Sequence, residues 1–444
     1  MPHIFARRRQ QLMDAYGPGS ILIVPAAREQ QRNADVDYAF RQDSDFYYLT
    51  GFEEPDAILV LCPGRQGEQV VLFVRPRDRD AETWNGRRAG VEGAVDRYRA
   101  EKAFSISEFE TELPRLVEGT RQVCFTLGRH APLDKIVLAA AQRHRTQPRL
   151  GIDGPDYFAD PLAVLSEMRL HKQPQEIETL RRAASITAQG HHEAMRIGAP
   201  GVGEWEMQAA LEFVFQASGS QRVGYGSIVA AGENATILHY TTNRQRAADG
   251  DLVLIDAGAE LDFLTADVTR VFPVSGRFSP AQRAVYEVVL EAELRAIDAC
   301  RVGRAAQDVH DVAVRTLTEG MVSLGLLDGN VTDLIASEAY RRYYMHRTSH
   351  WLGMDVHDVG RYRQGGEWRS LAAGMVLTVE PGIYIAKDDT SAPIALRGIG
   401  IRIEDDVLVT DDGPDVLTGE CVKEIEDIEA MVASAPRHVS RISA

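Results

Sequence analysis

The pattern of apolar and polar positions changes about a third of the way along the chain. Before that point, short apolar runs predict buried strands at residues 22–24, 57–61 and 70–74. Helical spacing predicts helices over residues 106–118 and 133–145. This mixture predicts a smaller α/β domain at the amino terminus.

A long helix is predicted just after residue 170. Pro174 stands in its first turn, where proline is well tolerated, and is followed by QEIETLRRAASITAQGHHEAMRI. We therefore place a domain boundary at about residue 172. The two predicted domains are residues 1–172 and 173–444.

Helices and long strand pairs alternate beyond this boundary helix. Further helices are predicted at residues 204–218, 279–299 and 305–324. The fold class predicted for the second domain is α+β, with helices flanking a curved antiparallel sheet. The residues after about 434 predict a polar, frayed tail.

Composition excludes some classes of function. The chain has 444 residues, and 49 Lys and Arg against 65 Asp and Glu give a net charge of −16. Such a surface repels phosphate backbones, and no basic stripe is interleaved with aromatic residues, so nucleic-acid binding is not expected. Because no apolar run approaches the roughly 20 residues that span a bilayer, membrane insertion is not expected.

The cysteines and the amino terminus predict a cytoplasmic protein. The first residues carry charge throughout and lack an apolar signal core. The four cysteines are scattered, without metal-ligand spacing, which predicts free, mostly buried thiols in a reducing compartment. They are Cys62, Cys124, Cys300 and Cys421.

A pair of carboxylates is predicted on one hairpin. The apolar run 252–255 ends at Asp256, and a second strand is predicted over 264–274. With the turn centred on residues 261 and 262, Asp256 and Asp267 would face each other with Cβ atoms about 4.5–5.5 Å apart, where like charges repel. A divalent cation would relieve this repulsion. Two solvated hairpin carboxylates are the alternative for the pair taken alone.

Three histidines follow within twelve residues, at His346, His350 and His357. The spacing of the first two resembles a helical zinc pair, but the intervening Arg-Thr-Ser supplies no glutamate. Residues 351–356 are predicted as a strand. We therefore do not expect a helical zinc motif.

A second pair of carboxylates lies on the following strands. One apolar run ends at Glu380, where Pro-Gly interrupts pairing. In the next strand, isoleucines alternate with Arg402 and Glu404, so the charged pair lies on the opposite face. A simple ion pair is one interpretation, but a carboxylate on an otherwise apolar strand demands a partner, and a cation would serve.

Four carboxylates and one imidazole, without a thiolate, are a donor set for two Mn²⁺, Co²⁺, Fe²⁺ or Zn²⁺ ions. Two such ions about 3.5–4 Å apart activate water and polarise a carbonyl. The residues themselves therefore predict a metal-dependent hydrolase.

At these residues the sequence resembles the pita-bread metallopeptidases of the aminopeptidase P (Xaa-Pro aminopeptidase) type, a family that includes prolidase. The resemblance covers nearly the whole chain. It implies a pita-bread catalytic domain at the carboxy terminus and an amino-terminal domain of aminopeptidase P type. The motifs that carry it are RQDSDFYYLTGFEEPDA, GENATILHYTTN, LVLIDAG, SHWLGMDVHDVG, MVLTVEPGIYI and RGIGIRIEDD.

The resemblance implies two divalent ions, with Mn²⁺ expected and Co²⁺, Fe²⁺ or Zn²⁺ as alternatives. Asp267 and Glu404 would bridge both ions. One site would be completed by Asp256 and the other by His350 and Glu380.

The resemblance also implies roles for residues around the ions. Glu380 would manage the proton of the attacking water, and His357 would hydrogen-bond the developing oxyanion. As pocket residues, His239 and His346 would contact the backbone on the proline side. Arg402 would brace the ligand network; the alternative is a simple ion-pair partner.

Three further positions are implied at the substrate or a neighbouring subunit: Trp84, Asp35 and Tyr384. Trp84 as a plain surface anchor, and His239 as a packed strand-end histidine, are the alternatives. Arg347 and Thr348 depart from the family pattern, in which glycine and a small or apolar residue are common.

The implied activity is hydrolysis of the bond between an amino-terminal residue and a following proline, by a homo-oligomer (dimer or tetramer). Proline lacks an amide hydrogen and fixes φ, so its peptide bond needs a specialised pocket. The alternatives are a prolidase acting on Xaa-Pro dipeptides and a non-catalytic binding module. A methionine aminopeptidase is disfavoured by the long amino-terminal domain, and a creatinase-like protein by the ligand set.

Overall fold

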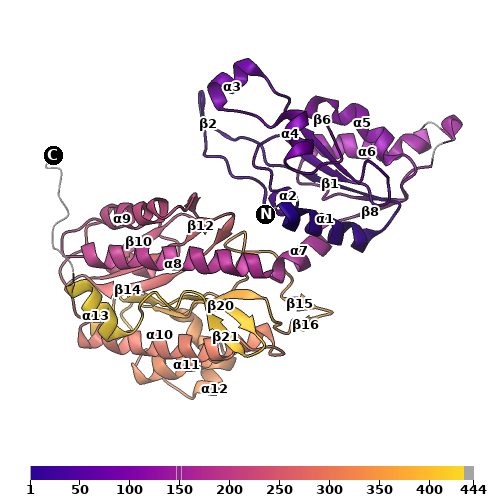
Figure 1. The fold of residues 1–444 in the computed structure, drawn as a ribbon. Coiled ribbons are helices and arrows are strands. Elements are labelled where there is room, and N and C mark those ends of the chain that lie inside the picture. The colour runs from indigo at the N-terminus through magenta and orange to yellow at the C-terminus, as the bar shows by residue number, and fades with distance from the viewer. Residues whose placement is uncertain (1, 147, 152, 435–444) are drawn as a thin grey trace. The chain divides into compact units, whose positions relative to one another are not determined.

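The computed structural model describes residues 2–146, 148–151 and 153–434 (Figure 1). The predicted tail after residue 434 lies outside the described residues. The chain forms two compact units, Met1–Glu167 and Met168–Ala444. Within the described residues, the helices are too short or too polar to cross a lipid bilayer.

The first unit is built on a mixed six-stranded sheet with the order β6-β5-β4-β1-β7-β8. β1 lies in the middle because it pairs antiparallel with β4 and parallel with β7. The predicted strands are confirmed, and β4 pairs with β5 as expected. The strands are β1 Ser20–Pro25, β4 Ile58–Leu61, β5 Val70–Val74, β6 Lys102–Ser105, β7 Gln122–Cys124 and β8 Tyr157–Ala159.

Two predicted helices of this unit pack on the sheet and bury its apolar face. The helix predicted from 106 begins as a 3-10 turn, Ile106–Glu108, and continues as α5, Phe109–Val117. Phe109 and Val137 belong to the same buried core as Val60 and Phe73 of the sheet. The remaining elements are α1 Pro2–Tyr16, β2 Gln31–Asn33, β3 Val36–Asp37, α2 Ser44–Thr50, α3 Arg79–Asn85, α4 Gly90–Asp96, α6 Ala131–Thr146 and α7 Leu162–Leu170.

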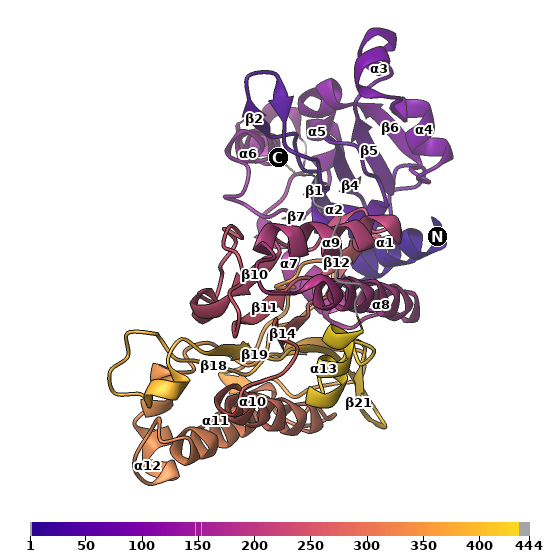
Figure 2. The same cartoon turned by 90° about the vertical axis from the view of Figure 1, so that its left-hand side faces the viewer.

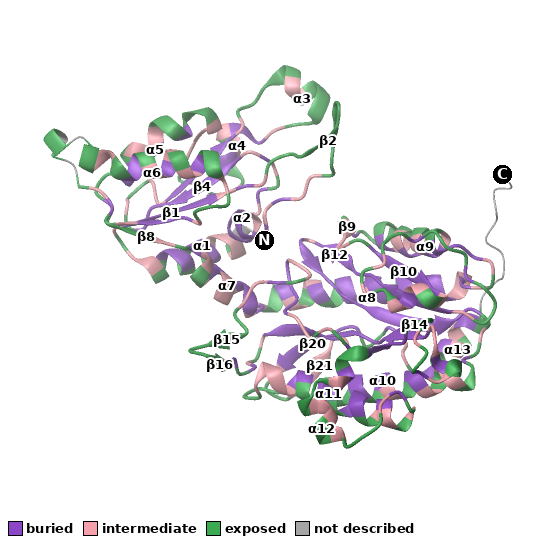
Figure 3. Cartoon of the chain, turned by 180° about the vertical axis from the view of Figure 1, so that it is seen from behind, coloured by how far each residue is buried: buried purple, intermediate pink, exposed green. Residues whose placement is uncertain are grey.

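The helices predicted for the second unit are confirmed. α8 begins at Pro174, and the Gln173 backbone N–H donates to Glu176 Oε2 (2.9 Å) in a capping box. α8 contacts β12 and β13, α9 contacts β9 and β10, and α10 contacts β17, β18, β19 and β21. Figure 3 shows the strands of this unit coloured mainly as buried, with exposed residues on the helices. The helices are α8 Pro174–Ile197, α9 Glu204–Ala217, α10 Pro280–Asp298, α11 Ala306–Ser323, α12 Val331–Ala336 and α13 Ile425–Ala433.

Short antiparallel sheets lie between these helices. Their orders are β10-β11-β14, β13-β12-β9, β17-β20-β21 and β18-β19. An isolated bridge between Thr269 and Glu404 links β14, in the sheet β10-β11-β14, to the segment between β19 and β20. Figure 2 shows β10, β11, β14 and β19 in succession. The strands are β9 Arg222–Val223, β10 Ile228–Ala231, β11 Leu252–Asp256, β12 Ala259–Leu261, β13 Leu264–Thr265, β14 Thr269–Pro273, β15 Arg363–Gln364, β16 Glu367–Trp368, β17 Val376–Val379, β18 Gly382–Tyr384, β19 Gly400–Arg402, β20 Asp405–Thr410 and β21 Gly413–Val416.

The predicted register of the acidic hairpin was wrong by two residues. Leu261 pairs with Leu264, and Asp256 pairs with Thr269 instead of Asp267. The turn is centred one residue later than expected because Asp262 and Phe263 both adopt positive φ (49° and 66°), as a two-residue hairpin turn requires. A shift of two residues preserves the face, since side chains alternate with period two.

The strand predicted over residues 351–356 was also wrong. Trp351 forms one bridge, to Leu377, and the chain then bends. Two ion pairs stabilise the bend: Arg169 and Lys172 both bind the buried Asp358 (2.5 and 3.0 Å). The second hairpin strand, expected over 264–274, is likewise interrupted between β13 and β14.

Candidate metal centre and active site

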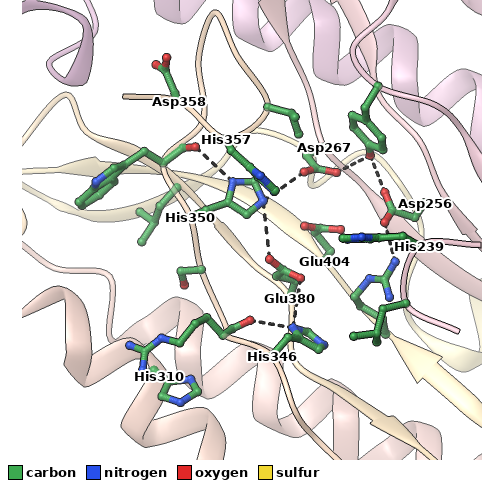
Figure 4. Close-up of a pocket in the computed structure, with 18 of the residues that line it drawn as sticks. His239, Asp256, Asp267, His310, His346, His350, His357, Asp358, Glu380 and Glu404 are labelled. Atoms are coloured by element: carbon green, nitrogen blue, oxygen red, sulfur yellow. Dashed lines mark hydrogen bonds and ion pairs between the residues drawn. The ribbon is translucent and has the colours of Figure 1, made fainter. Parts of the chain in front are cut away.

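A pocket of about 760 Å³ opens within the second unit and contains the acidic residues singled out in the sequence (Figure 4). Its polar lining comes from the ends of several strands, from α11 and from loops, including the loop after α12. The predicted site residues that line it are His239, Asp256, Asp267, His346, His350, His357, Glu380, Arg402 and Glu404.

The four carboxylates converge because each stands at or beside a strand end. Asp256 is the last residue of β11, and Asp267 lies between β13 and β14. Glu380 follows β17 directly, where Pro381 ends the pairing. Glu404 lies between β19 and β20, next to the bridge with β14. Strand ends from distant parts of the sequence thus meet at one point.

His350 completes the group and presents one ring nitrogen to it. Ligand atoms of Asp267, His350 and Glu404 all lie within 4.8 Å of one another. His350 Nε2 is 3.4 Å from Asp267 Oδ2 and 3.6 Å from Glu380 Oε1. On the other side of the ring, Nδ1 lies 3.1 Å from the Trp351 carbonyl oxygen, which accepts its proton. This hydrogen bond fixes the tautomer that leaves Nε2 free to bind a metal.

Arg402 braces the opposite side of the group. Its guanidinium donates to Asp256 Oδ2 (2.5 Å), Thr269 Oγ1 (3.0 Å) and the Tyr384 hydroxyl (3.1 Å). Thr269 in turn donates to Glu404 Oε2 (2.5 Å). Arg402 therefore orients carboxylates from two strands at once.

The electrostatics of the group favour a bound cation. Burial, reinforced by Asp267 and Asp256 and opposed by His350 and Arg402, raises the pKa of Glu380 to about 7. Burial and neighbouring carboxylates also raise the pKa of Glu404 well above its usual range. Carboxyl groups held so close ionise together only when positive charge is added.

The histidines of the pocket differ in their charge. Burial alone would lower the pKa of His350, but Asp267 and Glu380 outweigh it and raise this pKa to about 9. Burial lowers the pKa of His346 to about 4 and also lowers that of His357. His357 is exposed, and its ring meets that of His350 edge-on at 4.3 Å.

The three other predicted positions, Tyr384, Trp84 and Asp35, are not among the residues that line the pocket. The Tyr384 hydroxyl contacts His346 Nε2 (2.8 Å) and so reaches the pocket residues. Trp84 is on α3 and 87% exposed, and Asp35 is exposed in the turn between β2 and β3. Neither of these two lines the pocket.

The donor set fits divalent metal ions. It offers four carboxylates and one oriented imidazole nitrogen, without a thiolate, which suits Mn²⁺, Co²⁺, Fe²⁺ or Zn²⁺. Tyr225 shows that two of these carboxylates lie close together, because its hydroxyl hydrogen-bonds both Asp256 (2.5 Å) and Asp267. Carboxylate oxygens that share one small donor lie close enough to share an ion.

Tyr225, Thr269 and His310 are polar residues of the site that were not predicted from the sequence: Tyr225 and His310 line the pocket, and Thr269 contacts Glu404 and Arg402 beside it. Thr269 stands two positions after Asp267, so strand periodicity could have placed it on the same face. Tyr225 comes from the loop between β9 and β10, and His310 from α11. Nothing in their local sequence distinguishes these two from ordinary core residues.

The comparisons with known proteins cover nearly the whole chain. The family model described as Metallopeptidase family M24 matches residues 178–411, and that described as Aminopeptidase P, N-terminal domain matches residues 5–125. Xaa-Pro aminopeptidase of Escherichia coli is 45% identical over 432 residues, covering 97% of this chain and 98% of the relative. Xaa-Pro aminopeptidase of Haemophilus influenzae is 44% identical, covering 96% of each chain.

Solved structures are similar to both units. The structure of the aminopeptidase PepP from Pseudomonas aeruginosa has a TM-score of 0.97 and 48% identity, covering 99% of each chain. Zinc-substituted aminopeptidase P of E. coli, in complex with product, has a TM-score of 0.95 and 44% identity, again covering 99% of each.

Proposed function

This chain belongs to metallopeptidase family M24, and we propose that it is a metal-dependent exopeptidase that cleaves between an amino-terminal residue and a following proline. The observation that carries the proposal is the meeting of four strand-end carboxylates with His350 Nε2 in one pocket. The Xaa-Pro aminopeptidases of E. coli and H. influenzae match 96–97% of this chain, which favours this activity over that of a prolidase.

We further propose that the pocket holds two divalent ions, with Mn²⁺ as the expected metal. Asp256, Asp267, His350, Glu380 and Glu404 would hold these ions. When bound, such ions lower the pKa of water and polarise the scissile carbonyl.

In this proposal the chain's own residues move the proton and stabilise charge. Glu380 takes the proton of the attacking water, because burial raises the pKa of its carboxyl group to about 7, close to neutral pH. His357 donates an N–H hydrogen bond to the carbonyl oxygen as negative charge develops on it. Its lowered pKa means that the neutral imidazole is the donor at neutral pH.

Substrate orientation follows from the charges of the pocket. The free ammonium group of the peptide is drawn to the carboxylates, so cleavage takes place one residue from the amino terminus. His239 and His346 then contact the backbone on the proline side. Because proline fixes φ, a preformed wall can position the preceding carbonyl and thereby lower the entropy cost of the reaction.

Assembly and location complete the proposal. We propose a homo-oligomer in which Trp84 and Asp35 contact a neighbouring subunit, since an 87% exposed indole is otherwise costly. A lower mass for Trp84→Ala in light scattering would support this contact, and an unchanged mass would refute it. Because the four cysteines are free and buried, we propose the reducing cytoplasm as the compartment.

The test of the function is metal reconstitution followed by product analysis. The chelated protein is loaded with Mn²⁺ and given Ala-Pro-Ala, Ala-Pro and Ala-Ala-Ala. We expect free alanine and Pro-Ala from the first peptide only. Cleavage confined to the dipeptide would support a prolidase, and cleavage of none would refute the proposal.

The variant Asp267→Asn should lose bound metal and activity together. The matched control is Asp262→Asn, which lies in the turn of the same hairpin, does not line the pocket and has a positive φ that asparagine tolerates. Full activity in Asp267→Asn would remove this residue from the metal centre.

A further inference from the structure

Arg347 stands on the pocket wall directly after His346. The residue is exposed and lines the pocket. Its Nη2 donates to Gln307 Oε1 (2.5 Å), and its guanidinium carbon lies 5.2 Å from the centre of the Trp368 ring. An amide and an indole thus hold the guanidinium in place without neutralising it.

The pocket lining contains one other arginine, Arg402, and the two differ in their partners. Arg402 is buried and bonds Asp256 (2.5 Å). Within the part of the chain that the structure describes, Arg347 has no ion pair with a carboxylate. An arginine is permanently charged, and its planar fork matches the two oxygens of a carboxylate. Arg347 is therefore a cation directed at a substrate pocket with its charge unmatched.

The histidine of α11 beside Arg347 does not share its charge. Burial and the positive charge of Arg347 lower the pKa of His310 to about 3, so this ring is neutral at neutral pH. Arg347 is therefore the arginine of the pocket lining that has no ion pair with a carboxylate among the described residues.

The sign of the charge decides which part of a peptide Arg347 can receive. The substrate ammonium is repelled by a guanidinium and attracted by the carboxylates of the metal centre. An anionic group must therefore come from the other end of the peptide, beyond the proline. The Arg347 carbonyl oxygen lies 2.8 Å from His346 Nδ1, so the residue is anchored next to the wall assigned to that side.

Resting on the proposed function, we infer that Arg347 is a specificity-determining residue that binds a carboxylate of the peptide downstream of the proline. Two sources supply this group: the terminal carboxylate of a tripeptide, or an acidic side chain at the third position. Both present the same planar anion to the same guanidinium.

The experiment compares matched peptides with the Mn²⁺-loaded enzyme. Ala-Pro-Ala against Ala-Pro-Ala-amide tests the terminal carboxylate, and Ala-Pro-Glu-amide against Ala-Pro-Gln-amide tests the side chain. In at least one pair, the anionic peptide should have a KM lower by about three- to tenfold, with kcat little changed, as expected for a partly exposed charged hydrogen bond. Arg347→Met should abolish that preference, and Arg347→Lys should keep part of it.

The matched control is Arg363→Met. Arg363 lies over the same indole ring, 4.2 Å from its centre, but does not line the pocket. This variant should keep the wild-type preference. Equal preference in the wild type and in Arg347→Met, or no preference in the wild type, would overturn the inference while leaving the proposed function intact. If the wild type cleaves none of the four peptides, both proposals fail.

Discussion

Glu380 illustrates how one side chain can serve both as a metal ligand and in proton transfer. Its Oε1 points to His350 Nε2 (3.6 Å) and its Oε2 to His346 Nδ1 (3.5 Å). One oxygen therefore lies at the metal centre and the other at the pocket wall. A pKa raised to about 7 by burial means that its proton is lost and regained near neutral pH.

Glu380→Gln should reduce kcat by about 10²–10⁴-fold, the range typical of a lost general base. Activity of the wild type should rise with pH through the pKa of Glu380, since the ionised form is required and a bound cation can only lower that pKa below about 7. The variant should lose this acidic limb of the kcat profile. An unchanged limb in Glu380→Gln would assign it to another group.

His357→Ala should slow turnover without weakening the fold. The side chain is exposed, so its removal leaves no cavity, but it removes a donor to the developing oxyanion. We expect kcat to fall by about 10²–10³-fold with an unchanged Tm. His171→Ala, outside the pocket, is the control and should retain full activity. A His357→Ala enzyme that loses only substrate affinity would contradict the role in the transition state.

Single residues of the pocket could be predicted from the sequence where a charge stands at the end of, or within, an apolar strand. Asp256, Glu380 and Glu404 stand in this way and line the pocket, because a buried charge needs a partner. Tyr225 has no such signal in the sequence, since a tyrosine in a loop is common and its partners lie 31 and 42 residues away. The raised pKa of His350 also depends on such distant partners, which periodicity alone does not reveal.

At the scale of elements, the metal centre depends on how closely two strands approach each other. Gly258 lies between β11 and β12, and a Cβ added there would stand 1.7 Å from the Ala266 carbonyl oxygen. The neighbour of Ala266 is Asp267. A side chain at position 258 would therefore push the backbone that carries this pocket carboxylate.

Gly258→Ala should reduce metal affinity by about 10–100-fold, because ligand positions tolerate little displacement. A backbone shift of about 1 Å should reduce kcat/KM by about 10²-fold. Metal titration and kinetics measure the two effects. Gly419→Ala is the control, since the nearest atom to its added Cβ is at an ordinary 3.4 Å. Equal behaviour of the two variants would show that the strand approach does not set the ligand geometry.

Helices and strands were predicted correctly where the periodicity of apolar residues is strong. They were mispredicted where contacts between residues distant in the sequence determine the backbone conformation. α8, α10 and α11 follow from helical spacing, and α8 and α10 also have proline in the first turn. The hairpin register depended on two residues with positive φ, neither of them glycine, and such turns have a weak signal. The bend after Trp351 depends on Arg169 and Lys172, more than 180 residues away.

At the scale of the whole molecule, part of the net charge of −16 is explained by carboxylates that cluster in one pocket. Part of the acidic excess is gathered at one point, where Glu380, Glu404 and Asp267 have raised pKa values through burial and mutual repulsion. Composition predicts the excess but not its grouping, because grouping is a property of the fold. The metal-free second unit consequently holds electrostatic strain that a cation would release.

This strain predicts how the stability given by the metal should depend on pH. A carboxyl group whose pKa is raised in the folded state stabilises the metal-free protein below its unfolded pKa of about 4.3, and this contribution is lost as pH rises through the folded pKa. For Glu380 the window ends at about pH 7. A bound cation favours the ionised carboxylates and neutral His350, so metal affinity rises over the same window and further toward the raised pKa of His350, about 9.

The increase in Tm caused by Mn²⁺ should therefore be larger at about pH 7.5 than at about pH 5, reaching roughly 5–10 °C when the ion is at about 100 times its Kd. Calorimetry of the chelated and reloaded protein at both pH values measures it. Asp267→Asn should lose most of the increase, while Asp262→Asn should keep it, because only the first side chain faces His350 Nε2. An increase that is the same at both pH values would mean that the ion binds groups whose protonation does not change in this range, and so would place it outside the buried carboxylates.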